Sequence, residues 1–499
     1  MFSIRKVRTA SDSIAIQVVQ YRGHKSKIMK HIGSCKNTAE VSALIRKAKE
    51  WIANQTRQGS LFAESEQKIL FVDRGECVGI THQFARQFLL CCINECGLSG
   101  LNPLLLDLVI MRLIEPASKR RTVELLSHYF GISYSQRIYR NIPKLIKQQS
   151  LVEQYAYKIA VEKFKEPFYF VLYDVTTLYF ETFQSDELRV QGFSKDNKSQ
   201  QPQIVMGLLV TQSGFPLFYE VFPGNTFEGK TMLPVVENFM KQHKEVKPIV
   251  VADAAMLSEE RLTELRAKNI SYIVGARLAN ANLDLVKQIH AAIGNHNGTH
   301  ARFPSLHGDL VCDFSIKRYK KELHDLNKMI KKAEDLVATQ SSGKGVKFVK
   351  RISKEKVELN KPLIEKRKLL LGIKGYCTDL PEEKLPNEKV ISHYHNLWRI
   401  EQSFRMSKSD LETRPIFHRK GDAIRSHVLI CFTALIIEKY LELTTKLSLR
   451  DVRFLIWNIT ETQIQDRLTK EIFMFRSPTH DIMASPLAKL VKKWKLLPH

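Results

Sequence analysis

The chain has 499 residues, of which 44% are hydrophobic, so it is long enough for several domains with ordinary globular cores. Lysine and arginine number 77 and aspartate and glutamate 52, which gives a net charge of +25. This excess predicts a polyanionic partner. No apolar run is long enough to span a membrane, so nucleic acid is favoured over a lipid surface.

The cysteines give no sign of a structural metal site. There are 8, none of them in a CxxC pair, so reduced thiols in a cytoplasm are expected. The cluster FLLCCINEC falls in an apolar helical run, where cysteine is expected to pack as a small hydrophobe. The start, MFSIRKVRTA, lacks the apolar stretch of a signal peptide, and we therefore expect an intracellular protein.

Residues 1–75 are predicted to form a small basic module. The first 60 residues contain 12 basic and 3 acidic residues, a net charge of +9. Short strands are indicated by FSIRKVRT, IAIQVVQYRG and SKIMKHIGS, and a helix with apolar residues on one face by AEVSALIRKAKEWIANQ. This module is expected to bind DNA, with a solvated basic face on an ordinary domain as the alternative.

Residues 76–162 are predicted to be helical. A helix, a break at Gly131 and a second basic helical stretch are indicated by KRRTVELLSHYFGISYSQRIYRNIPKLIKQ. The pattern is compatible with a helix-turn-helix, although any two helices joined at a glycine look similar.

The pattern changes at residue 163, and residues 163–285 are predicted to form the first part of an α/β core. A buried strand, EPFYFVLYD, ends at Asp174, and two further strands, IVMGLLVT and FPLFYEVFPG, follow it. Next come a helix, the strand KPIVVAD ending at Asp253, a helix capped by Ser258 and the strand SYIVGAR. Antiparallel strands followed by αβ units predict one mixed sheet.

Residues 286–374 interrupt this core as a basic insertion. A long amphipathic helix is predicted for YKKELHDLNKMIKKAEDLV, and SSGKG separates it from a second, mainly helical stretch. Between Lys317 and Lys368 there are 17 basic and 7 acidic residues. A solvated helical hairpin and a hairpin lying along DNA remain equally open.

The core resumes in residues 375–450 with the strand GYCTDL, and residues 451–499 are predicted to be a helical tail.

The second part of the core contains a candidate site. A single helix is predicted for SHYHNLWRIEQSFRMSKSDLETR, on which Tyr394, Glu401 and Lys408 recur every seven residues and share one face. Asp174 and Asp253 each follow an apolar strand, where open α/β sheets place their ligand sites. Taken singly, either aspartate is more often a turn or cap residue. With Glu401 they predict an all-carboxylate site for two Mg²⁺ or Mn²⁺ ions that would act on a phosphodiester.

The neighbours of this site are expected to be structural. Trp398 and Phe404 are predicted to lie in the core, and His427 heads an apolar helix, where a structural role is the more frequent. The segment GNTFEGKT lacks the spacing and the strand–helix setting of a phosphate-binding loop, so use of ATP is not expected.

Several separated blocks resemble one known family. The chain is similar to DDE transposases of bacterial insertion sequences, in the branch with a Y-R-E-K signature and an insertion before the glutamate (the IS-four superfamily). The blocks are YDVTTLYFET, GFSKDNKSQQPQIVMGLLVTQSGFPLFYEVFPGNT, VVADAAMLSEERL, YIVGAR and YHNLWRIEQSFRMSK. The similarity extends from about Lys163 to Leu443.

The resemblance implies an RNase H-like mixed-sheet α/β core with an insertion before the catalytic glutamate, preceded by the basic α+β module and the helical region. It implies that Asp174, Asp253 and Glu401 are catalytic metal ligands. The signature tyrosine and lysine correspond to Tyr394 and Lys408, which would bind DNA beside the cut.

The chain departs from the signature at one position, because Leu397 stands where arginine is expected. Arg399 would lie on another face of the helix. Arg405, one turn after Glu401, is better placed to bind DNA. The carboxylates are unaffected by this departure.

The resemblance implies a transposase that binds double-stranded DNA at the terminal inverted repeats of an insertion sequence and at its target. It would act as a homodimer in the synaptic complex, by metal-dependent strand cleavage and strand transfer. Cut-and-paste transposition in a prokaryotic cytoplasm, at the nucleoid, is expected. Two alternatives are an RNase H-like nuclease without strand transfer and a catalytically silent DNA-binding protein derived from a transposase.

Overall fold

The computed structural model describes residues 2–9, 13–22, 25–36, 38–56, 72–135, 138–165, 169–194, 198, 200–254, 258–305, 308–339, 346–352 and 357–497. The chain divides into two compact units. One consists of Met1–Gly75 with Asp466–Leu468, and the other of Glu76–Gln465 with Thr469–His499.

The first unit contains a three-stranded antiparallel sheet covered by a helix. The elements are β1 (Phe2–Arg8), β2 (Ile14–Arg22), β3 (Lys25–Cys35) and α1 (Thr38–Thr56). Ile16 and Val18 of β2 are buried against Val41 and Ala48 of α1, because alternate strand residues face the same side of a sheet. The predicted three strands and helix are confirmed.

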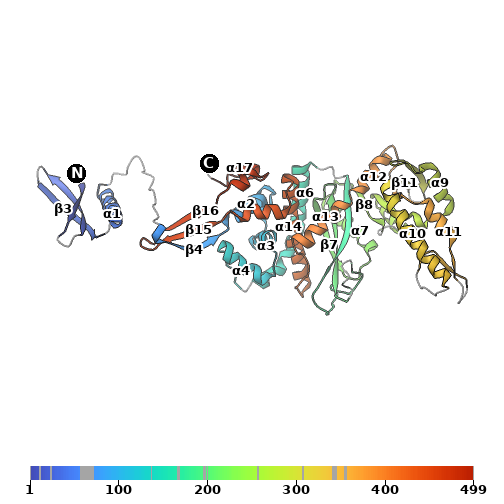
Figure 1. Ribbon diagram of the computed structural model, residues 1–499, viewed down its shortest axis with the longest axis horizontal. Helices are drawn as coiled ribbons and strands as arrows, with labels where there is room; N and C mark the ends of the chain where they lie inside the picture. The colour runs from blue at the N-terminus through green and yellow to red at the C-terminus, as the bar shows by residue number, and fades with distance from the viewer. Residues whose placement is uncertain are drawn as a thin grey trace. The chain divides into compact units, whose positions relative to one another are not determined.

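A helical layer opens the second unit (Figure 1). It consists of α2 (Gln83–Glu95), α3 (Pro103–Ile114), α4 (Lys119–Phe130), α5 (Ile138–Asn141), α6 (Gln149–Phe164) and, from later in the chain, α14 (Gly421–Thr445). α14 is apolar on all sides and buries 19 of its 25 residues, packing against α3, α6 and the 3-10 segment Ile142–Gln148. Of the clustered cysteines, Cys92 and Cys96 are buried, as expected, whereas Cys91 is half-buried.

The helix-turn-helix pattern does not produce a recognition helix. Gly131 ends α4 with a left-handed φ of 70°, as glycine commonly does. The four-residue α5 and the 3-10 segment follow, and the amide of Ile146 donates to Ser426 Oγ of α14 at 3.1 Å. The described residues of this stretch after Gly131 pack on a buried helix and contain no long regular helix of the kind that reads a DNA groove.

An eight-stranded mixed sheet forms the core of the second unit, in the order β10-β11-β14-β9-β8-β5-β6-β7. Its first six elements in the chain are β5 (Phe170–Tyr179), β6 (Gln203–Thr211), β7 (Pro216–Pro223), α7 (Met232–Gln242), β8 (Ile249–Ala252) and α8 (Glu259–Ala267), followed by β9 (Ser271–Ala276). β5 is antiparallel to β6 and parallel to β8, which is parallel to β9. The predicted element order is confirmed, and the mixed sheet is consistent with an RNase H-like core.

The insertion extends this sheet instead of forming the expected helical hairpin. It contains α9 (Leu283–Ile293), β10 (His300–Ser305), β11 (Gly308–Phe314), α10 (Ile316–Ala338), β12 (Val349–Arg351), β13 (Val357–Leu359) and α11 (Lys361–Leu369). β11 pairs with β14 (Ile373–Thr378), the strand predicted as GYCTDL. The predicted long helix is confirmed as α10. The four strands of the insertion, β10 to β13, were not predicted. The segment SSGKG lies outside the described residues. Leu326 and Ala333 of α10 are buried, so one face of the helix belongs to a core.

The helical tail predicted for residues 451–499 is wrong in part. The helices are α15 (Leu449–Trp457), α16 (His480–Ala484) and α17 (Ala488–Lys493). Between them, β15 (Glu461–Asp466) and β16 (Ile472–Arg476) form a sheet with β4 (Gly75–Thr81). None of the helices in the described ranges is both long and apolar enough to cross a membrane.

One buried carboxyl group makes the stability of the second unit depend on pH. Glu153 of α6 is 1% exposed, and it accepts hydrogen bonds from Gln149 and Gln242, each at 2.9 Å. Burial raises the pKa of Glu153 from 4.5 to about 7. Between these values the folded protein holds a proton that the unfolded chain has released, so this group makes folding less favourable as the pH rises.

Glu153→Gln is expected to raise the free energy of unfolding at pH 8 by on the order of 2–3 kcal/mol, because the amide replaces a group that must ionise there. At pH 4.5 the gain should vanish. Urea unfolding at both pH values measures the effect, with Glu162→Gln on the exposed side of α6 as the control. Equal gains at the two pH values would contradict the assigned shift.

Candidate active site

A polar cavity of about 400 Å³ is lined by residues of β5, β14 and the end of β8 and by two helices that follow β14. These helices are α12 (Asn387–His395) and α13 (Trp398–Arg405). The three predicted carboxylates, Asp174, Asp253 and Glu401, all line this cavity. The fold therefore brings together acidic residues that lie far apart in the sequence.

Strand pairing places the two aspartates side by side. β5 and β8 are parallel neighbours, and their last paired residues are Tyr173 and Ala252, directly before Asp174 and Asp253. Asp253 follows the end of β8, as predicted. Asp174 does not end its strand, because β5 continues to Tyr179 along β6. Asp174 is half-buried and Asp253 is exposed.

The single helix predicted for residues 392–414 is interrupted. α12 and α13 are separate, and a π-helical segment, Met406–Asp410, follows them. Tyr394, Glu401 and Lys408 lie on these three segments in turn, so the straight shared face predicted from their spacing is wrong. Tyr394 and Glu401 nevertheless line the cavity, whereas Lys408 is not in its lining.

Of the predictions for the residues near Glu401, some are confirmed by the structure and others are not. Arg405 is exposed at the end of α13 and does not line the cavity. Trp398, expected in the core, is 51% exposed, and the guanidinium of Arg399 lies 4.8 Å from its ring centroid. Phe404 is 7% exposed and belongs to the core, as predicted.

Tyr394 fixes the orientation of one carboxylate. Its hydroxyl donates to Asp253 Oδ1 at 2.9 Å, and only 4% of the residue is exposed. A side chain at Gly275 of β9 would place its Cβ 2.5 Å from the tyrosine hydroxyl, so the glycine provides the space for this contact. Burial and the charge of Asp253 raise the pKa of Tyr394, which keeps the phenol protonated as a donor.

Lys374 is a cationic residue of the cavity lining that the sequence analysis did not identify. It lies on β14, is half-buried, and has its Nζ 4.3 Å from the ring centroid of Tyr394. Burial and the charge of Arg318 lower the pKa of Lys374, while Asp253 and Glu401 oppose this shift. Among the described residues no carboxylate forms a salt bridge with it. The predicted strand began one residue later, so no sequence signal marked this lysine.

The insertion contributes to the polar wall beside this cavity. The Tyr376 hydroxyl of β14 donates to Asp313 Oδ1 of β11 at 2.8 Å and lies 3.2 Å from His395 Nε2. Burial lowers the pKa of His395, which also lines the cavity. Sequence reasoning missed this group because β11 was not predicted.

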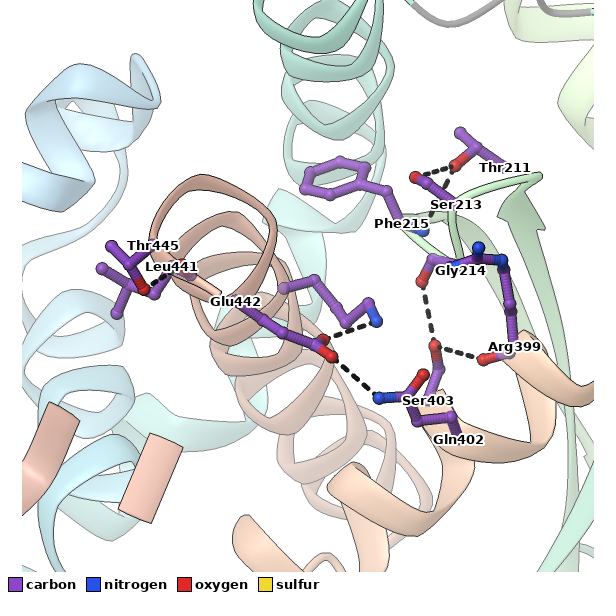
Figure 2. Close-up of polar contacts among 11 residues, drawn as sticks. Thr211, Ser213, Gly214, Phe215, Arg399, Gln402, Ser403, Leu441, Glu442 and Thr445 are labelled. Atoms are coloured by element: carbon purple, nitrogen blue, oxygen red, sulfur yellow. Dashed lines mark hydrogen bonds and ion pairs between the residues drawn. The ribbon is translucent and has the colours of Figure 1, made fainter. Parts of the chain in front are cut away.

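The back of α13 is attached to two other elements (Figure 2). Ser403 Oγ lies 2.9 Å from the carbonyl oxygen of Gly214, in the turn between β6 and β7. Gln402 Nε2 donates to Glu442 Oε1 of α14 at 2.8 Å, and Lys439 holds the other oxygen of that carboxylate at 2.6 Å. Gly214 has a φ of 84°, which favours glycine. These bonds fix the helix from the side that does not line the cavity.

The donor chemistry of the site fits a hard divalent cation. Three carboxylates around a polar cavity are the ligands that Mg²⁺ and Mn²⁺ prefer. Within the described ranges, no three His, Cys, Asp or Glu side chains are arranged closely enough to hold a metal ion as they stand. The carboxylates would therefore have to move together to bind one.

Two solved transposase complexes are distantly similar to this chain. A piggyBac transposase synaptic complex with hairpin DNA shares 9% identity, with 75% of this chain and 77% of that chain covered and a TM-score of 0.38. A Mos1 transposase paired-end complex with left transposon end shares 13% identity, with 46% and 66% covered and a TM-score of 0.16. No curated protein matches the chain.

A family model described as "Transposase DDE domain" matches residues 166–437. The matched range is more than half of the 499 residues. It contains β5, β8, α13 and the three carboxylates that these elements bring to the cavity. The chain therefore belongs to the family of transposases with a DDE domain.

Proposed function

We propose that this protein is a DNA transposase that binds the ends of an insertion sequence, cuts a strand there and joins the freed end to target DNA. The family comprises metal-dependent enzymes that cut DNA. The observation that carries the proposal is that Asp174, Asp253 and Glu401 line one cavity with Lys374. Cut-and-paste is the pathway that we propose.

The three carboxylates are proposed to be the catalytic metal ligands, for Mg²⁺ or Mn²⁺ as two ions. Bound divalent ions would act as Lewis acids on phosphate oxygens. Asp253 and Glu401 are exposed and Asp174 is half-buried, so a phosphodiester can approach the set. Tyr394 holds Asp253 by one hydrogen bond, so this carboxylate is oriented before the other two move toward a metal ion.

The proposed reaction has two steps at one site. Water attacks the phosphorus at the element end and the P–O3′ bond breaks, leaving a 3′-hydroxyl and a 5′-phosphate. The 3′-hydroxyl then attacks a target phosphodiester, forming a new P–O bond and releasing a target 3′-hydroxyl. Charge develops on the non-bridging oxygens in both steps, and the Lys374 ammonium, which lines the same cavity, would stabilise it.

Membership of the Y-R-E-K branch is also proposed. Leu397, at the position of the signature arginine, lines the cavity without a charge, and Lys374 of β14 supplies a cation there. Arg405 and Lys408 lie outside the lining and are proposed to bind phosphates farther along the DNA. Lysine acts at such a site as a point charge, without the bidentate geometry of arginine.

The proposed partners are the terminal inverted repeats and target DNA, both double-stranded, bound by a homodimer in the synaptic complex at a prokaryotic nucleoid. The net charge of +25 supports DNA as the partner. A nuclease without strand transfer and a silent DNA-binding protein are the alternatives, which differ from a transposase in their reaction products.

Asp174→Asn, Asp253→Asn and Glu401→Gln are each expected to abolish cleavage of a duplex carrying the presumed element end in Mg²⁺. DNA binding should be nearly unchanged, because an amide removes the charge of a metal ligand but little volume. Denaturing gels of the products and fluorescence anisotropy measure the two properties.

Glu383→Gln, an exposed carboxylate away from the cavity, is the control for these variants. Cutting at the wild-type rate by any of the three variants would remove that residue from the site. Nicked but never joined wild-type products would favour the nuclease, and binding without cutting would favour the silent protein.

Lys374→Ala is expected to slow single-turnover cleavage by about 10- to 100-fold, because the ammonium beside the reacting phosphate is removed. Lys408→Ala and Arg405→Ala should have smaller effects, since neither residue lines the cavity. A scissile methylphosphonate, which lacks the oxygen charge, should reduce the difference between wild type and Lys374→Ala.

Lys384→Ala, in an exposed turn, is the matched control for these lysine variants. An undiminished effect of Lys374→Ala on the methylphosphonate would mean that Lys374 acts on the fold and not on the phosphate. Thermal melts of each variant test the same point independently.

The basic module is proposed to bind DNA through β3, whose residues 25–31 are exposed. Replacing Lys25, Lys27 and Lys30 together by glutamine is expected to weaken binding to element ends. It should also make binding less sensitive to salt. The slope of log binding constant against log salt concentration should become shallower by up to about 0.9 for each phosphate that the variant no longer neutralises. Anisotropy titrations from low to high salt measure the slope.

A second triple variant tests whether removing three positive charges elsewhere on the protein weakens DNA binding and its salt dependence equally. Lys241, Lys244 and Lys247 are also exposed, and lie in and after α7. Equal slopes for the two triple variants would mean that the module contributes only to net charge.

A further inference from the structure

A second cavity, of about 260 Å³, lies outside the active site, and half of its lining residues are arginine, lysine or histidine. Arg112 of α3 and Lys119 of α4 meet there with Arg414, His418 and His427 from the later part of the chain. The sequence singled out His427 as structural, and its Nε2 does lie 2.9 Å from the carbonyl oxygen of Thr413.

Two cations of this cavity are buried without a carboxylate partner. Lys119 is 6% exposed and Arg112 is 5% exposed. Arg112 donates to the carbonyl oxygens of Leu411 and Ala117, at 3.4 and 3.3 Å. In the described part of the chain, neither side chain forms a salt bridge, and the Lys119 ammonium has no hydrogen-bond acceptor.

The charge of this cavity is unbalanced. Glu412 is its acidic lining residue, but it is exposed. Burial and Arg112 lower the pKa of Lys119, and burial together with these two cations lowers the pKa of His418 to about 4. A buried cation is unfavourable unless an anion neutralises it, so the arrangement favours a negatively charged ligand.

The aromatic rings of the cavity favour a nucleotide as that ligand. Tyr139 and Phe417 line it and are 48% and 67% exposed. Exposed rings beside cations are the combination that holds a base and its phosphate. Guanidinium and ammonium groups bind phosphate through charge-assisted hydrogen bonds.

The cavity lies at the end of a strand of the active site. Ile416 forms a bridge with Phe180, directly after β5, and the guanidinium of Arg414 lies 5.5 Å from the ring centroid of Tyr179. Asp174 is six residues before Phe180, roughly 20 Å along an extended strand. A DNA strand leaving the active site covers that distance in about six nucleotides at duplex spacing.

We propose that this cavity binds the phosphate group of a nucleotide through Lys119 and Arg112. A strand of the DNA that is being processed is the favoured source, and this choice of source rests on the proposed function. A free nucleotide offers the same phosphate chemistry.

The test uses the full-length protein without a divalent metal, so that cleavage plays no part in it. Binding of inorganic phosphate, a deoxynucleoside monophosphate and a single-stranded oligonucleotide is measured by calorimetry at constant ionic strength. Lys119→Met, which removes the charge but keeps the length, is expected to weaken binding about 10- to 100-fold, as the loss of one charge-assisted hydrogen bond would. Lys119→Arg should retain it, and Lys384→Met should match the wild type.

A stability measurement separates ligand binding from a structural role. Without phosphate, Lys119→Met is expected to melt at a higher temperature than the wild type, because it removes an unpaired buried charge. Lys439→Met is the contrast and should melt lower, because Lys439 is buried but paired with Glu442. A lower melting temperature for Lys119→Met together with unchanged binding would overturn the proposal.

The ligands distinguish the two sources. Tight binding of the oligonucleotide alone supports a DNA strand, and binding of the monophosphate alone supports a free nucleotide. No binding of any of the three probes, or equal binding by Lys119→Met, overturns the proposal. A wild type that binds the probes but never cuts DNA would contradict the proposed function and leave this site standing.

Discussion

The parallel pairing of β5 with β8 is the constraint on which the rest of the active site depends. The register that pairs Tyr173 with Ala252 places Asp174, within β5, beside Asp253, directly after β8. Main-chain hydrogen bonds, which are insensitive to side-chain identity, therefore position the two acids. The third acid is positioned differently, by side-chain bonds from Gln402 and Ser403 behind Glu401.

Much of the core could be predicted from the sequence because its signals are local. Buried strands such as β6 are continuous apolar runs, and α10 repeats its apolar residues every three or four positions. The break between α12 and α13 was missed, although His393 and His395 followed by Asn396 are a helix-ending signal, because the seven-residue spacing was interpreted as one continuous helix. The seven-residue spacing still placed Tyr394 and Glu401 at one cavity, but it failed for Lys408.

The residues that were missed depend on contacts between distant segments. β10 and β11 contain charged and polar residues, and they become strands by adding to the edge of an existing sheet. β15 and β16 are likewise completed by β4, from the other end of the chain. Lys374 lies one residue outside the predicted strand, and its proximity to Tyr394 follows from how α12 crosses β14. Periodicity within one segment contains no information of this kind.

The burial of α14 means that the helices packed against it cannot complete their core until late in the synthesis of the chain. This helix completes the core of α3, α6 and the segment between them, yet it follows α6 by more than 250 residues. At a synthesis rate of about 5–20 residues per second, the apolar faces of those helices wait for roughly 15–50 s on the ribosome before their partner emerges. During that time they are surfaces on which a nascent chain aggregates or a chaperone binds. The amount of active protein that a cell obtains is therefore set partly by how well this interval is protected.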